Sequence, residues 1–436
     1  MDQEVLVREC QIRCLLIVSF EALLSGTVAR HVEGLRQSSE HDVEVADVGT
    51  LNRYHIDLGR FDVIVFHYSI AIAEGYHVKS GLRSRLATAG ALKILFIQDE
   101  YRWIDATAEA IRELGITVLF TVVNEDVVEQ VYHHPWLHKV RKEVTLTGFV
   151  DERLLRLEVP KYGERPIDVA YRARKVPFWL GSLAAEKWKI GEKFLSEAQT
   201  LGLRCDISSD ETARLYGDRW VRFLSSTKAV LGTESGASVC DFSGRIQREV
   251  ERAMARDSTT SFEVIKRDIF AAEDGRTIIH VISPRMFEAA ALRTLMINYP
   301  GDYSGRLVAW RHYVPLAKDH SNIEEVVQVI KDSDRAQKII DAAYREVACN
   351  YDNTFRAMVA HFDRVVREEC GLTAPKARGA WDGLTQSFGV GKLEAFSWTD
   401  FYLRRLVANL IRRASPLARM VLPKSAHWWI RSRLAK

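Results

Sequence analysis

The sequence predicts an α/β protein with two parallel-sheet domains in tandem, followed by a basic tail. Three observations support this prediction. Short apolar runs alternate with amphipathic segments through residues 12–155, a proline-containing stretch interrupts the pattern at 159–166, and the same alternation then starts again. Short apolar strands that alternate with helices imply parallel sheets covered on both faces.

The first domain is predicted to span residues 1–155. Helical spacing is expected at 28–36 and 106–114, and the pattern fades near 146–155. Strands are expected at 12–20, 41–48, 62–69, 92–99 and 117–123.

The second domain is predicted to span residues 156–370. The linker 159–166 carries two prolines, a glycine and several charges, which is typical of a domain boundary. The charged segment 244–275 is predicted to be a helical excursion between two strands of the second sheet. Strands are expected at 167–173, 203–208, 228–233, 276–282 and 294–299, and helices at 184–202, 285–293, 323–332, 335–349 and 354–369.

Composition limits the classes of protein. The 436 residues are 47% hydrophobic and 27% charged, which is globular composition, and the formal net charge of +3 argues against a nucleic-acid partner. Six cysteines, at 10, 14, 205, 240, 349 and 370, form no Cys-x-x-Cys pair, so reduced thiols are expected. The start of the chain is acidic and carries no apolar signal region, and no apolar run approaches the roughly 20 residues that span a bilayer. These features predict a cytoplasmic protein.

The tail, residues 371–436, differs in composition from the domains. Residues 376–392 are predicted to be a flexible link, and 401–422 is apolar on one side and arginine-rich on the other. Nine Lys or Arg and no Asp or Glu lie between 401 and 436, together with Trp428 and Trp429. Basic amphipathic helices with tryptophan bind anionic membrane surfaces, so a peripheral position on the inner face of the membrane is expected. The alternative is a tail folded against its own domains or a partner subunit.

A strand-to-helix junction at Ser283 is the main candidate binding feature. Pro284 suits the first position of a helix, and Arg285 and Glu288, three residues apart, share one helical face. A helix N-terminus offers unpaired N–H groups to phosphate, and Arg285 can add charge-assisted hydrogen bonds.

Four sequence elements follow one another here: S-P-R-x-F-E-A at 283–289, G-x-Y-S-G at 301–305, R-H-Y-x-P-L at 311–316 and D-x-S-N at 319–322. With these elements the chain resembles the GT-B glycosyltransferases, and more narrowly their bacterial spore-maturation-protein-like, or "family 1", branch. The resemblance covers 145–370 well and the first half more loosely. It implies a GT-B architecture, with two doubly wound, Rossmann-like domains that face a cleft.

The resemblance implies a hexosyltransferase of polysaccharide biosynthesis. Such an enzyme moves a sugar from a nucleotide-diphosphate donor to a hydroxyl of a glycan or lipid-linked acceptor. Glu288 matches the glutamate that accepts from the ribose hydroxyls in the family. Many relatives have glycine where this chain has Arg293, and His280 stands near the position of a second glutamate, so inversion or retention is not predicted. The candidate donor-binding residues are Arg172, Arg174, Glu234, Ser235, Gly236, Ser283, Arg285, Glu288, Tyr303, Ser304, His312 and Tyr313.

The first domain is expected to hold the acceptor and the catalytic base. A base must lie within hydrogen-bond reach of the acceptor hydroxyl. His67, Asp99 and Glu100 follow predicted strands, at the carboxyl edge where a cleft forms, and are the candidates. The alternative is that they cap helices or join salt bridges.

No metal or other cofactor is predicted for the transfer. The chain has no Asp-x-Asp motif, and His133-His134 is predicted to be a loop because no carboxylate follows at helical ligand spacing. Basic residues and a helix dipole are expected to stabilise the leaving diphosphate. Two other functions remain open: a non-catalytic sugar-nucleotide or glycan-binding protein of a polysaccharide assembly complex, and a nucleotide-sugar epimerase.

Overall fold

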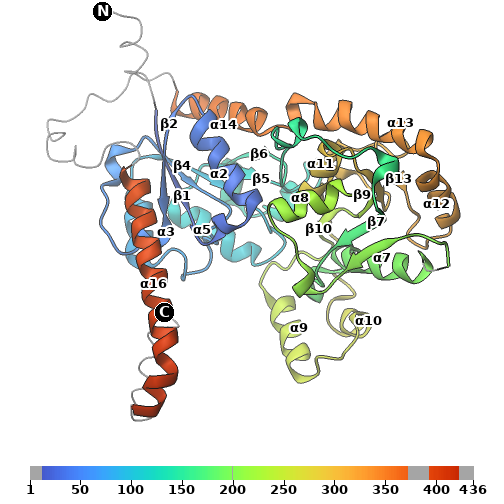
Figure 1. Ribbon diagram of the computed structural model, residues 1–436. Helices are drawn as coiled ribbons and strands as arrows, with labels where there is room; N and C mark the ends of the chain where they lie inside the picture. The colour runs from blue at the N-terminus through green and yellow to red at the C-terminus, as the bar shows by residue number, and fades with distance from the viewer. Residues whose placement is uncertain (1–11, 199, 372–391, 422–436) are drawn as a thin grey trace, which may run out of the picture.

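The computed structural model describes residues 12–371, apart from residue 199, and residues 392–421. Two Rossmann-like domains lie side by side (Figure 1), which confirms the predicted fold class. The first sheet has the strand order β2-β1-β3-β4-β5-β6, and all its strands are parallel. Its strands are β1 (Arg13–Val18), β2 (Asp42–Asp47), β3 (Val63–Phe66), β4 (Leu92–Phe96), β5 (Val118–Thr121) and β6 (Arg141–Val144).

Both faces of the first sheet are buried. In β1, Leu15 and Ile17 enter the core on one face, and Leu16 and Val18 enter the core on the other. This two-sided burial explains why the strand is one continuous apolar run. Helices α4 (Ser80–Thr88) and α5 (Ile104–Leu114) pack in the core on the Leu15 face of the sheet. Helices α2 (Gly26–Ser38) and α14 (Phe355–Cys370) pack in the core on the Leu16 face.

The sequence does not predict β6. This strand reads Arg-Lys-Glu-Val and pairs with β5 at the edge of the sheet. None of its residues is fully buried, so it lacks the apolar run by which the central strands are recognised.

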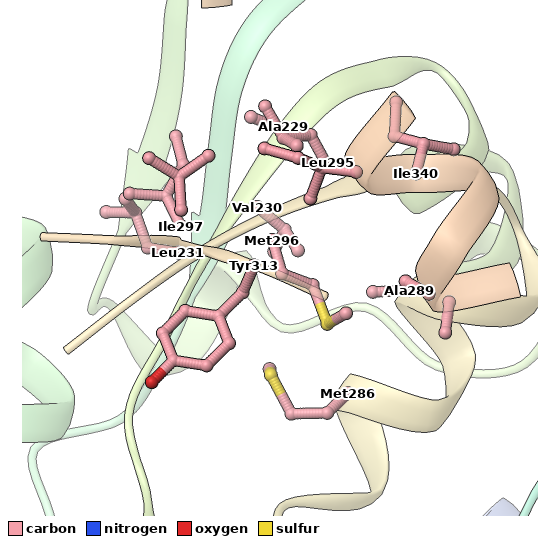
Figure 2. Packing of buried hydrophobic residues seen from close by; sticks show 14 of the residues in the cluster. Ala229, Val230, Leu231, Met286, Ala289, Leu295, Met296, Ile297, Tyr313 and Ile340 are labelled. Atoms are coloured by element: carbon pink, nitrogen blue, oxygen red, sulfur yellow. The ribbon is translucent and has the colours of Figure 1, made fainter. Parts of the chain in front are cut away.

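The second sheet has the order β13-β12-β9-β7-β8 and is also parallel. Its core joins β9 and β12 to the helices that cover them, as Figure 2 shows. The strands are β7 (Ile167–Arg172), β8 (Cys205–Ser208), β9 (Thr227–Gly232), β12 (Leu295–Asn298) and β13 (Val314–Pro315). The helices of this half are α7 (Ser182–Ala198), α8 (Asp218–Ser225), α11 (Pro284–Ala291), α12 (Ile323–Lys331) and α13 (Ser333–Ala343).

One strand prediction is wrong. The segment 276–282 does not join the second sheet: β11 (Ile279–Val281) pairs antiparallel with β10 (Ser235–Ala237) in a separate two-stranded sheet. The charged excursion lies between these two strands, and its helices are α9 (Arg245–Arg256) and α10 (Phe262–Ile265) (Figure 1). Apolar content alone does not specify which strand pairs with which.

The helix α14 returns from the second domain to the first. Met358, Phe362 and Val366 enter the same core as Leu16 of β1. The predicted boundary at residue 370 groups this helix with the second domain, whereas its apolar face packs on the first. Helical periodicity identifies the apolar face but not the surface that the face covers.

The tail helix α16 (Lys392–Val421) begins against the first domain and extends beyond it (Figure 1). Trp398 and Phe401 contact Phe20, and Asp400 accepts a 2.9 Å hydrogen bond from Thr50. The predicted link at 376–392, apart from Lys392, and the pair Trp428 and Trp429 lie outside the described residues. Among the helices of the described part of the chain, none has the length and apolarity needed to cross a bilayer.

Candidate functional site

A cleft of about 580 Å³ lies between the two domains. The first domain contributes the start of α2 and the loop after β4. The second domain contributes the ends of β7 and β9, the segment around α8 and the start of α11. This is the position beyond the carboxyl ends of parallel strands where α/β domains bind ligands. The predicted site residues that line it are Asp99, Arg172, Arg174, Ser235, Gly236, Ser283, Arg285 and Glu288.

Packing of α11 on the second sheet sets the direction of its polar residues. Met286 and Ala289 enter the core against β9 and β12 (Figure 2). Arg285 directly precedes Met286, Glu288 directly precedes Ala289, and both line the cleft. The apolar residues of the helix therefore determine where its guanidinium and carboxyl groups lie.

The N-terminus of α11 opens into the cleft. Ser283 is the N-cap, and its side chain makes no capping hydrogen bond within the described structure. Pro284 has no N–H, and the Met286 N–H donates to the Ser283 carbonyl at 2.9 Å, whereas the Arg285 N–H makes no hydrogen bond to the described residues. This amide and the positive end of the helix dipole face the cleft. Gly148 allows a close approach here, because a Cβ at this position would lie 2.7 Å from Cβ of Pro284.

Glu288 is held by a residue that the sequence does not single out. The indole N–H of Trp220, in α8, donates a 2.8 Å hydrogen bond to Oε2 of Glu288. Oε1 accepts no hydrogen bond from any residue of the described ranges. Burial raises the pKa of the Glu288 carboxyl, whereas the Trp220 donor and the Arg285 charge act in the opposite direction.

Arg285 lies between two aromatic rings. Its guanidinium carbon is 4.8 Å from the ring centre of Tyr171 and 5.3 Å from that of Trp220. It also donates a hydrogen bond to the backbone carbonyl of Arg172. No carboxylate forms an ion pair with it in the part of the chain that the structure describes, so its charge remains available to a ligand.

Lys187, in α7, is the second cation of the cleft and was not predicted. It lines the cleft and is largely buried, with no ion pair to any described residue. The pKa of its ammonium group is lowered to about 8, mainly by burial and also by the charges of Arg285 and Arg174, whereas Asp99 acts in the opposite direction. Lysine near the start of a long amphipathic helix gives no local signal that separates it from a solvated surface lysine.

Arg172 and Arg174 have different surroundings. Arg172 is used structurally: its guanidinium donates to the carbonyl groups of Ala213 and Asp206 and pairs at 2.8 Å with the Asp206 carboxylate. Arg174 is exposed at the cleft and forms no hydrogen bond or ion pair with the described residues. Arg174 therefore joins Arg285 and Lys187 as a cation without a fixed acidic partner.

Strand β10, which follows β9, requires a glycine. Gly236 has φ +107°, and a Cβ there would lie 1.9 Å from the carbonyl oxygen of Ile279. Only glycine avoids this overlap, so β10 and β11 can pair where they border the cleft. Ser235 precedes it and also lines the cleft.

Five of the predicted donor-binding residues lie behind the cleft wall: Glu234, Tyr303, Ser304, His312 and Tyr313. Glu234 accepts a 2.8 Å hydrogen bond from the backbone N–H of Tyr303, and the Ser304 hydroxyl accepts one of 3.1 Å from Ile282. His312 is buried and pairs with Glu346, at 2.9 Å. Tyr303 and Tyr313 are also buried, and none of the five lines the cleft. These residues hold the loops that form the wall.

Asp99 is the predicted base candidate that reaches the cleft. It is exposed, has φ +57°, and accepts a hydrogen bond from the Tyr101 hydroxyl. A positive φ is uncommon for a residue other than glycine, and such backbone strain is concentrated at functional sites. Asp99 faces the second domain from the carboxyl end of β4.

Glu100 and His67 lie away from the cleft. Glu100 is 4% exposed and accepts hydrogen bonds from Thr121, Tyr132 and the backbone N–H of Val122, and burial raises the pKa of its carboxyl to about 7. His67 is fully buried; its Nδ1 accepts from the Ser69 backbone N–H, so its Nε2–H donates to Nδ1 of His31, at 3.1 Å. Neither side chain can contact an acceptor in this arrangement.

The structure also explains how Arg293 occupies a position where many of the resembling glycosyltransferases have glycine. This residue follows the end of α11 with φ +51°, the left-handed conformation that most often holds glycine after a helix. Its guanidinium lies 4.0 Å from the ring centre of Tyr344, away from the cleft lining.

Comparisons with solved structures establish the fold. An alpha-glucosyltransferase in complex with UDP-glucose and DNA containing an abasic site aligns with a TM-score of 0.52 and 8% identity, over 82% of this chain and 99% of that chain. An alpha-glucosyltransferase in complex with UDP and a 13-mer DNA containing a central A:G mismatch gives 0.51 and 8%, over 81% and 99%. A glycosyltransferase from Rickettsia africae ESF-5 gives 0.48 and 11%, over 84% and 100%. No protein-family model and no curated protein sequence matches the chain. The class defined by the architecture is the GT-B fold.

Proposed function

We propose that the protein is a glycosyltransferase that uses a nucleotide-diphosphate sugar. The acceptor in this proposal is a hydroxyl of a glycan or lipid-linked molecule. The GT-B fold is consistent with this chemistry, and the four ordered elements between 283 and 322 support the narrower spore-maturation-protein-like branch.

The observation that carries the proposal is a set of cations without acidic partners. Lys187, Arg174 and Arg285 line one cleft, and the N-terminus of α11 opens into it. Holding like charges together costs free energy, and burial raises this cost for Lys187. A bound diphosphate would offset the repulsion and accept a hydrogen bond from the Arg285 N–H at the start of α11.

Glu288 extends the same site toward the nucleoside. Trp220 orients one carboxylate oxygen by its hydrogen bond, and the other oxygen is left for a donor on the ligand. A ribose diol supplies two hydroxyl donors within one carboxylate's reach. This arrangement supports a nucleotide over inorganic diphosphate.

The first domain supplies the proposed base. Asp99 lies across the cleft from α11 and is exposed to it. A carboxylate there can accept the proton of the attacking hydroxyl, while the cations and the helix dipole stabilise the leaving nucleotide diphosphate. In this proposal the transfer itself needs no metal ion.

We also propose that α16 holds the enzyme on an anionic membrane surface. Tyr402, Leu403, Leu406 and Val407 are each exposed by half or more and recur at helical spacing, so they form one apolar face. Residues 401–436 carry nine basic and no acidic side chains, which complements anionic lipid. Residues 392–401 are anchored to the first domain, which places this face at a defined edge of the enzyme.

Nucleotide binding tests the main proposal. A thermal-shift screen with UDP-, GDP-, ADP- and dTDP-sugars should show one stabilising base, since ligand at 100 times its Kd adds about 2.7 kcal/mol to the free energy of unfolding. Slow donor hydrolysis should accompany binding and disappear in Glu288→Ala. A response to no nucleotide would refute the proposal, and binding without hydrolysis or transfer would favour the non-catalytic function. A DNA duplex belongs among the acceptors tested, because transfer to DNA would contradict the proposed acceptor class.

Vesicle binding tests the membrane proposal separately. Leu403→Glu/Leu406→Glu should abolish co-sedimentation with phosphatidylglycerol vesicles, whereas a control at exposed apolar residues elsewhere, Leu157→Glu/Val308→Glu, should not. Equal binding by both variants would contradict it. Removal of all of α16 is a poorer test, because the helix also packs on the first domain.

A further inference from the structure

Two adjacent histidines of a loop and a carboxylate from a helix meet outside the lining of the donor cleft. Asp105 lies in the first turn of α5, and His133 and His134 lie just before the turn Pro135–Lys139. Nε2 of His134 is 3.0 Å from Oδ1 of Asp105, and one ligand atom from each of the three residues lies within 4.8 Å of the others. The local sequence shows no carboxylate at ligand spacing from the histidines, but the fold supplies one.

Aromatic packing holds the two imidazole rings. The His134 ring stacks on Trp136, with centroids 4.5 Å apart and an interplanar angle of 17°. Trp136 is fixed by a 3.2 Å hydrogen bond from its indole N–H to the carbonyl of Ala108. The His133 ring packs edge-on against Phe242, with centroids 5.3 Å apart. These contacts position both rings beside Asp105, and the His133 ring, which is exposed, can still rotate toward it.

The third residue is also anchored. The backbone N–H of Asp105 donates a 3.0 Å hydrogen bond to the carbonyl of Phe242. Its carboxylate is partly exposed in the first turn of α5. An ionised carboxylate and neutral imidazoles are the protonation states that bind a metal ion.

The spacing suits a small divalent ion. Ligand atoms about 2.0–2.2 Å from a tetrahedral Zn²⁺ lie roughly 3.3 Å from one another. The observed 3.0 Å between His134 and Asp105 differs from this by a few tenths of an ångström, and rotation of the exposed His133 ring can close the remaining gap. Imidazole with carboxylate is a donor set of zinc and its transition-metal neighbours rather than of Mg²⁺ or Ca²⁺.

We propose that Asp105, His133 and His134 form a binding site for a divalent transition-metal ion of the zinc class. Three protein ligands leave one coordination position open. Asp105 and His133 also line a separate pocket of about 450 Å³, whose wall includes Cys240 and Glu273 from the second domain. Among the described residues, none lines both this pocket and the donor cleft. The proposed metal ligands are thus not part of the donor-cleft lining.

Metal titration of the full chain without an affinity tag tests this site. The protein is treated with chelator, desalted, and titrated with Zn²⁺ by calorimetry and with Co²⁺ by visible absorption. We expect one saturable site per chain. His133→Ala, His134→Ala and Asp105→Asn should each weaken Zn²⁺ binding at least about tenfold, because even the loss of an outer partner of a metal ligand costs 10- to 100-fold.

A matched variant is His138→Ala, which removes an exposed histidine from the same segment and should leave the affinity unchanged. Thermal unfolding in chelator shows whether each variant keeps its fold, and His133 is exposed, so its replacement is the safest of the three. Absence of saturable binding in the wild type would overturn the proposal. Wild-type affinity in all three ligand variants would also overturn it, as would a loss of affinity in His138→Ala as large as the loss in the ligand variants.

Discussion

Trp220 donates its indole N–H to the carboxylate of Glu288 over 2.8 Å. Trp220→Phe keeps an aromatic ring beside Arg285 and removes only the donor. We expect nucleotide affinity to fall roughly three- to tenfold, since one hydrogen bond contributes about 1 kcal/mol. Calorimetric titration measures this change. Trp136→Phe loses an indole hydrogen bond outside the cleft and should bind nucleotide like the wild type; similar losses in both variants would contradict a specific role for Trp220.

Nucleotide binding should weaken as the pH rises through about 8. Burial lowers the pKa of Lys187 to about 8, so the free protein loses this charge above that pH, whereas a bound diphosphate favours the ammonium form. Titrations between pH 7 and 9.5 should show the affinity falling by up to about tenfold per pH unit above 8.

The conservative variant isolates the cause of that pH dependence. Lys187→Arg should retain binding and lose the dependence, because a guanidinium stays protonated. Lys189→Arg, at the exposed partner of Glu263 two residues further along α7, should behave as the wild type does. A wild-type affinity that stays constant across this range would show that Lys187 does not contact the ligand.

Asp99→Asn should separate binding from chemistry. The amide keeps the size of the side chain and cannot accept a proton, so donor hydrolysis and transfer should fall by roughly 10²- to 10⁴-fold while nucleotide affinity stays within about twofold. The rates of donor hydrolysis and transfer are measured with the nucleotide sugar that the thermal-shift screen identifies. Asp126→Asn, at an exposed residue outside the cleft lining, serves as the comparison. Full activity in Asp99→Asn would exclude it as the base.

Glu100 should make stability depend on pH without any effect on catalysis. Its pKa is raised by burial to about 7, so between about pH 4.5 and 7 the folded state holds a proton that the unfolded state has released. The free energy of unfolding therefore falls as the pH rises through this window, by up to about 3 kcal/mol. Glu100→Gln should remove this component in denaturant unfolding at pH 5 and 7.5. Exposed Glu125→Gln should not, and an identical pH profile in Glu100→Gln would contradict the assignment.

Gly236→Ala should destabilise the wall of the cleft. The added Cβ would overlap the Ile279 carbonyl, and the backbone conformation at φ +107° disfavours any side chain. We expect a loss of at least about 2 kcal/mol in the free energy of unfolding and weaker nucleotide binding. Gly163→Ala has open space around its Cβ and should change stability by less than about 0.5 kcal/mol. Equal stability of the two variants would contradict the close approach of β10 and β11.

Much of the architecture is visible in the sequence because both sheets are buried on both faces. The runs around Leu15 and Leu231 are apolar throughout, so their strands are recognised without a partner. The edge strand β6, which begins at Arg141, lacks this apolar signal. Strand β11 has the signal but pairs with β10 and not with the second sheet. Strand pairing depends on contacts between distant segments, which local composition does not encode.

For the site, the sequence by itself determined the junction at Ser283 and the common face of Arg285 and Glu288, because helix geometry relates residues three apart. Only the tertiary structure decided which other groups meet that face. Lys187 and Trp220 reach it because α7 and α8 pack on the same domain, and Asp99 reaches the cleft from the other domain while its neighbour Glu100 is buried. The same reason applies to Asp105 and the two histidines: the fold joins segments whose proximity no local spacing expresses.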